Sequence, residues 1–144
     1  MREKLRVYRL LSWYKKLKEE QIQSQVARLK KELNDLQEKK AEVVWEREKR
    51  YQELSKKRKM TAEELRGFFS DIEALKNLEQ QIVKNIEFKA KELENTSKTL
   101  IEAYKQRRLM ETLTKKTEDL WRFEETKRFY KELDDLVVLR YKKG

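Results

Sequence analysis

Cysteine, histidine and proline are absent from this chain of 144 residues, and glycine occurs only twice. Without cysteine and histidine there is no disulfide, no thiolate chemistry, no ordinary zinc site and no side chain whose unperturbed pKa lies near neutral pH. Catalysis would rest on lysine, tyrosine or carboxylates, which need an enclosed pocket to shift their pKa values. We therefore predict a protein that is not an enzyme, with no catalytic residues, no metal site and no cofactor.

Long apolar runs are also missing. The longest is the four-residue stretch 136–139, whereas a helix that spans a bilayer needs about 20 predominantly apolar residues. The N-terminal stretch MREKLRVYRLLSWYKKLKEE contains acidic residues and no small-residue cleavage site, unlike a signal peptide. These features predict a cytoplasmic protein.

Charged side chains dominate the composition. They form 44% of the chain against 38% hydrophobic residues, which leaves too little apolar mass for a compact globular core. The net charge is +10, but basic and acidic residues are interleaved through most of the chain, as on a solvated helix face. We therefore expect no nucleic acid among the partners.

Regularly spaced apolar residues argue against a disordered polyampholyte. They recur at alternating spacings of four and three residues, which is the seam of a coiled coil. The first seam comprises Ile22, Val26, Leu29, Leu33, Leu36 and Val43, with Lys40, Arg47 and Arg50 at later seam positions, and upstream a stripe of Leu10, Tyr14 and Leu17 after a phase shift. The second comprises Phe68, Ile72, Leu75, Ile82, Ile86, Leu93, Leu100 and Ala103, interrupted by Glu79 and Lys89.

The break between the seams lies at residues 55–65, where Thr61 and Glu64 have the spacing of a capping box. Helices are therefore predicted at 3–57 and 62–142, joined by a turn at 58–61, in a single domain of residues 1–144. A short turn makes two helices antiparallel neighbours. The predicted fold is all-α: an antiparallel two-helix coiled-coil hairpin with an extended C-terminal helix, in which Lys40 and Glu79 lie within about one or two helical turns of each other.

The second helix is longer than the first, which is predicted to end opposite residues 113–118. Residues 120–141 nevertheless keep an apolar coiled-coil spacing, widened by Trp121, Phe129 and Leu136. An exposed helix of this kind would aggregate, so another protein, a second copy or a membrane surface should cover it. The alternative is that this tail bends back onto Tyr8, Trp13 and Tyr14 to form a small terminal bundle.

A second group of apolar residues lies off the seam near the turn. Single surface hydrophobes are normal. Several of them near one end of a hairpin agree equally well with two interpretations, scattered surface residues and a contact patch. The group comprises Val44, Trp45, Tyr51, Phe69 and Leu78.

Residues 125–136, ETKRFYKELDDL, resemble the C-terminal motif of the FliJ family, the small coiled-coil component of the flagellar type III export machinery. The stretch LEQQI at 78–82 is similar to one that follows the turn in that family. RLMETL at 108–113 is similar to its Leu-rich stretch before the final charged motif. With the chain length and the longer second helix, the resemblance covers nearly the whole chain.

The resemblance implies a non-enzymatic stalk or coupling component, similar to the central stalk of rotary ATPases and peripheral at the inner face of the cell membrane. The implied partners of this monomer are the hexameric export ATPase, the membrane export gate protein and substrate chaperones. The residues expected to bind the ATPase are Leu120, Phe123, Lys127, Arg128, Tyr130, Lys131, Leu133 and Val137. Those expected to bind the export gate are Val44, Tyr51, Phe69 and Leu78.

Other functions stay open from the sequence. A virulence-type secretion system has a related component, and a V/A-type ATPase has a similar but usually longer central stalk subunit. A generic coiled-coil adaptor or homodimeric scaffold, and a basic nucleic-acid-binding hairpin, complete the alternatives.

Overall fold

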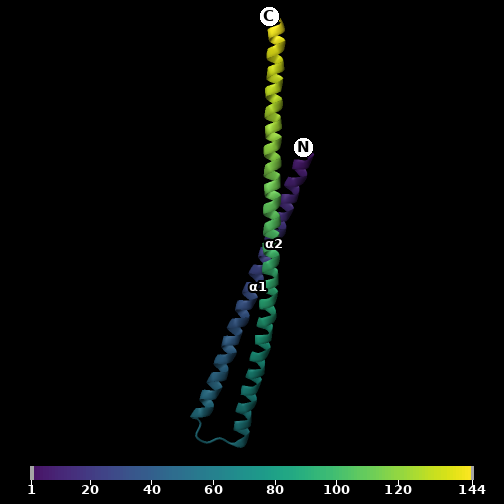
Figure 1. Cartoon of the computed structure of the whole chain (residues 1–144). Helices are drawn as coiled ribbons and strands as arrows, with labels where there is room; N and C mark the ends of the chain where they lie inside the picture. The colour runs from purple at the N-terminus through teal and green to yellow at the C-terminus, as the bar shows by residue number, and fades with distance from the viewer. Residues whose placement is uncertain (1, 144) are drawn as a thin grey trace. The chain divides into compact units, whose positions relative to one another are not determined.

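The computed structural model describes residues 2–143 and contains two long helices, α1 (Arg2–Lys56) and α2 (Ala62–Lys143), with no strand in that range (Figure 1). The all-helical prediction is confirmed, and the two helices pack together. Their bounds lie within one residue of the predicted 3–57 and 62–142. Met1 and Gly144, the ends of the predicted domain, lie outside the described residues.

Packing divides the chain into two units. The tip unit is Gln23–Thr99 and contains the loop between the helices. The terminal unit combines Met1–Ile22 with Leu100–Gly144. Each unit pairs one segment of α1 with one segment of α2, so neither has a third layer that could bury the outer side of a helix.

The tip unit has an apolar seam with the predicted spacing. Its packed side chains follow one another at alternating intervals of three and four residues, which keeps one edge of each helix against the other. Val26, Leu29, Val43, Ile72 and Ile82 are buried, and Leu33, Leu36, Leu54, Phe68, Leu75, Ile86 and Leu93 are half-buried. The apolar seam residues predicted for this unit therefore pack as expected.

Ion pairs cross between the two helices of the tip unit. The Nζ atom of Lys89 lies 2.8 Å from Oε2 of Glu32, and Nη2 of Arg50 lies 3.6 Å from Oδ2 of Asp71. The ammonium of Lys89 lowers the pKa of the Glu32 carboxyl, and Glu32 in turn raises the pKa of Lys89. The residue farther along α1, Arg50, pairs with the residue nearer the start of α2, Asp71, whereas Glu32 pairs with Lys89 farther along α2.

A third pair lies within the seam itself. Arg47 binds Glu79, and both side chains are 19% exposed. The sequence predicted Lys40 within about one or two helical turns of Glu79. In the structure the carboxylate of Glu79 pairs with Arg47, one heptad nearer the loop. A charged pair at a seam position specifies register, because a slipped alignment would leave each charge facing apolar side chains.

The terminal unit keeps the same spacing, but about half of its packed positions are polar. They are Leu5, Tyr8, Ser12, Lys15, Glu19 and Ile22 on α1, and Leu100, Ala103, Arg107, Met110, Thr114, Thr117 and Trp121 on α2. The predicted phase shift to Leu10, Tyr14 and Leu17 is wrong. These side chains are 65%, 53% and 39% exposed, because the bond between Glu19 and Arg107 and the burial of Leu5 hold the original edge of α1 against α2.

The end of α2 extends past the start of α1 (Figure 1). Nη2 of Arg9 lies 2.9 Å from Oε1 of Glu118, and Trp121 is half-buried beside Leu5. The region paired with α1 therefore reaches Trp121, beyond the predicted limit of 113–118. Every residue from 122 to 142, here called the overhang, is exposed.

The overhang does not bend back on the N-terminal aromatics. The helix α2 is unbroken to Lys143, and Trp13 remains 61% exposed. The fold-back bundle considered from the sequence is therefore absent from this structure.

Thr61 caps α2 as predicted, since its Oγ1 accepts a hydrogen bond from the backbone N–H of Glu64 at 3.2 Å. Replacing Thr61 by Ala should cost about 1 kcal/mol of stability because that N–H loses its partner. Thermal unfolding followed by circular dichroism would measure the loss, with Thr61→Ser as the control that retains a hydroxyl. Equal stability of the Ala and Ser variants would contradict the capping role.

Candidate protein-binding surfaces

A polar network lies between the helices of the terminal unit. Arg107 donates from Nε to Glu19 and from Nη1 to Oε1 of Glu111 at 2.7 Å. Glu19 is only 6% exposed. The hydrogen bonds that Arg107 donates to Glu111 and Glu19 raise the pKa of Arg107.

Two threonines next to this network are satisfied within their own helix. Thr114 donates to the carbonyl of Met110 at 2.7 Å, and Thr117 donates to the carbonyl of Leu113 at 2.8 Å. Such bonds allow a hydroxyl to face a helix contact without a partner on the other helix. The polar positions of the terminal seam thus have hydrogen-bond partners, but they do not add to its buried apolar area.

Most apolar residues of the α1 segment lie on its outer side, away from the packed Leu5 and Ile22. We call this set the outer stripe: Val7, Leu10, Leu11, Trp13, Tyr14 and Leu17, which are 39% to 65% exposed. In the heptad frame that Leu5, Tyr8 and Ser12 define, these residues occupy the side of α1 turned away from α2. Residue spacing alone revealed Leu10, Tyr14 and Leu17, but the sequence interpretation assigned them to the packed edge.

The overhang also has an apolar face, on the side of α2 opposite its packed edge. Continued past Trp121, the packed edge holds the charged residues Glu124, Arg128, Lys131 and Asp135. The opposite side holds Phe123, Tyr130, Leu133 and Val137, which are 67%, 61%, 41% and 63% exposed. A longer α1 could therefore not have covered this face.

The predicted ATPase-binding residues consequently divide between two sides of α2. The four apolar residues of the overhang face lie together, with Lys127 and Leu120 at one border of that face. Arg128 and Lys131 belong to the opposite edge, and Nη1 of Arg128 lies 3.5 Å from Oε1 of Glu125. The apolar part of the predicted site is contiguous, whereas its positive charges are not.

The four predicted gate-binding residues are not equally available. Val44 is half-buried next to the seam. Tyr51 and Phe69 are 40% and 54% exposed and share one flank of the seam. Leu78 is 44% exposed but lies on the other flank.

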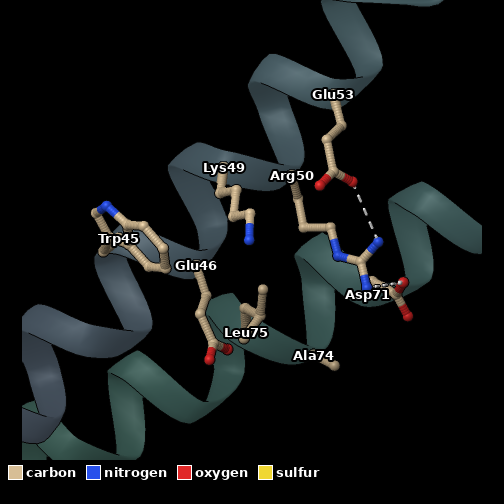
Figure 2. Close-up of a pocket in the computed structure, with 8 residues that line it drawn as sticks. All are labelled: Trp45, Glu46, Lys49, Arg50, Glu53, Asp71, Ala74 and Leu75. Atoms are coloured by element: carbon tan, nitrogen blue, oxygen red, sulfur yellow. Dashed lines mark hydrogen bonds and ion pairs between the residues drawn. The ribbon is translucent and has the colours of Figure 1, made fainter.

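A shallow groove of about 500 Å³ lies on the flank of the tip unit that carries Leu78 (Figure 2). Arg50 reaches across it toward Asp71 and also contacts Oε2 of Glu53 at 3.4 Å. Lys49 lies over the exposed ring of Trp45, with Nζ 5.2 Å from the ring centroid. Trp45 was recognised from the sequence. The charged residues that line the groove beside it were missed, because they come together only when the two helices pair.

The chain matches no protein-family model, no curated protein sequence and no solved structure. Among the described residues, neither helix has a stretch long and apolar enough to cross a membrane.

The pair Glu19 and Arg107 offers a test of the polar seam. Glu19→Leu should lower the melting temperature, because Arg107 loses one of its two carboxylates in a largely buried position. The double variant Glu19→Leu/Arg107→Leu should melt at least as high as the wild type, since leucines suit a coiled-coil seam. A single variant as stable as the wild type would contradict this role.

Proposed function

We propose that this protein is a non-enzymatic stalk or coupling component of the flagellar type III export apparatus. Its overhang binds the hexameric export ATPase, and its tip unit binds the membrane export gate protein. It acts as a monomer in the cytoplasm, at the inner face of the cell membrane, where substrate chaperones are further partners. The helices form an antiparallel coiled-coil hairpin, which the opposed numbering of the ion pairs supports.

The observation that carries the proposal is the overhang. It is helical, exposed over its whole length, and apolar on a side that α1 cannot reach. A slender helix with an apolar face and bordering charges suits insertion into a groove or ring of a partner protein. The resemblance of residues 125–136 to the FliJ motif falls on this same segment.

A homodimeric scaffold is the main alternative, since a second copy could also cover the overhang. Light scattering of the full-length protein separates the two. One chain per particle agrees with the stalk, whereas a stable dimer that dissociates when the overhang is removed favours the scaffold.

Truncation after Glu124 should abolish binding to the export ATPase while leaving the paired part of the chain folded, because packing ends at Trp121. Pull-down with the purified ATPase would measure binding, and circular dichroism would measure folding. A point variant of the apolar face, Tyr130→Ser/Val137→Ser, should weaken binding at least 10-fold, since roughly 1.4 kcal/mol corresponds to a factor of ten.

The matched control is Arg128→Ser/Lys131→Ser on the opposite side of the same segment. It should change binding less than the apolar variant, because exposed charges affect association rate more than final affinity. Unchanged ATPase binding after truncation would contradict the proposed role of the overhang.

The gate contact predicts an effect of Tyr51→Ser/Phe69→Ser. These exposed side chains contribute little to the seam, so the melting temperature should stay nearly unchanged while gate binding weakens. Pull-down with the cytoplasmic part of the gate protein would measure the loss, and Phe88→Ser, at an exposed aromatic of the same unit outside this group, is the control. Unfolding of the variant, or unchanged gate binding, would contradict the assignment.

A further inference from the structure

The outer stripe of α1 is unlike the other apolar surfaces of the protein in its charge. Residues 2–18 contain seven basic side chains and one acidic side chain, Glu3. The overhang, residues 122–142, contains six basic and five acidic ones. The overhang can thus satisfy charges of both signs on a protein partner, whereas residues 2–18 select for a negatively charged surface.

Within residues 2–143, hydrogen bonds or ion pairs to α2 are formed by two of these seven cations. Arg9 binds Glu118, and Lys15 donates to Oε1 of Gln106 at 2.9 Å. The other five are exposed: Arg2, Lys4, Arg6, Lys16 and Lys18. In the heptad frame, Lys4 and Lys18 border the outer stripe on one side and Arg6 borders it on the other.

The side chains of the stripe suit the boundary between lipid headgroups and acyl chains. Leu10, Leu11 and Leu17 supply aliphatic surface, and Trp13 and Tyr14 have the amphipathic rings that concentrate at membrane interfaces. The helix α2 lies on the other side of this segment, so a flat surface can approach the stripe without separating the two helices. A basic helix with these residues on one face lies in the plane of the interface and does not span the membrane.

We propose that the outer stripe of α1, with Lys4, Arg6 and Lys18 at its borders, binds the surface of an anionic lipid bilayer. The apolar side chains enter the headgroup boundary while the cations contact lipid phosphates. This interaction goes beyond the proposed stalk function and does not depend on the ATPase or the gate.

Vesicles of phosphatidylglycerol mixed with phosphatidylcholine test the proposal, with pure phosphatidylcholine vesicles as the comparison. The full-length chain carrying Trp45→Phe and Trp121→Phe retains Trp13 as the sole tryptophan. Its fluorescence should shift to the blue with the anionic vesicles and not with the neutral ones. Added salt should weaken the binding, because the cations lie at the water-exposed border.

Two sets of variants in the full-length protein separate the contributions. Leu10→Gln/Leu17→Gln should lower the partition coefficient on the order of 100-fold through lost apolar contact. Lys4→Gln/Arg6→Gln/Lys18→Gln should lower it by a similar factor of about 100. The control Leu133→Gln/Val137→Gln, on the overhang face, should leave it unchanged, and circular dichroism should show the same helicity for every variant.

Several results would overturn the proposal. They are no binding to anionic vesicles, equal binding to neutral vesicles, or loss of binding in the overhang variant and not in the outer-stripe variant. A particle mass of two chains that falls to one in Leu10→Gln/Leu17→Gln would assign the stripe to a second copy. Loss of ATPase binding in that variant with lipid binding intact would assign it to the protein partner.

Discussion

Each helix in this protein has only one neighbour, and that constraint governs both units. Two paired helices can bury one edge each, so most large apolar residues elsewhere are exposed. The packed edge is defined by the alternation of three and four residues, and charged pairs within it oppose slippage. Arg47 with Glu79 acts in the tip unit, and Glu19 with Arg107 acts in the terminal unit.

The two units use their apolar residues differently. In the tip unit, aliphatic side chains such as Leu29 and Ile72 fill the seam, and their burial stabilises the pairing directly. In the terminal unit, Glu19, Arg107 and Thr117 occupy seam positions while most leucines and aromatics of α1 face outward. Exchanging the two sets would bury more apolar area, so the observed arrangement costs stability. That cost is understandable if the outward residues bind partners.

The seams, the helix bounds and the cap of α2 could be predicted because each depends on residues close together in the sequence. The errors occurred where packing overrides local polarity. Upstream of Ile22, the sequence interpretation chose the packed edge by apolarity and assigned Leu10, Tyr14 and Leu17 to it. The alternation of three and four residues, continued upstream from Ile22, leads instead to Glu19 and Lys15. Which residue pairs with Glu79 depends on the register of the two helices. Whether Leu78 and Tyr51 lie on the same flank of the seam depends on how the flanks of one helix align with those of the other. A single sequence does not determine these to better than about one heptad.

The direction in which the apolar surfaces face limits how partners can bind. Past Trp121 the former packed edge of α2 becomes charged at Glu124, Arg128, Lys131 and Asp135, and the apolar face appears on the opposite side. A partner of the overhang must therefore approach from the side that α1 never covers, and it can do so without displacing α1. The same holds for the outer stripe, because its residues face away from α2. Since neither surface is covered when the helices pair, binding at either one requires no unfolding of the terminal unit, and its selectivity depends on the charges at its border.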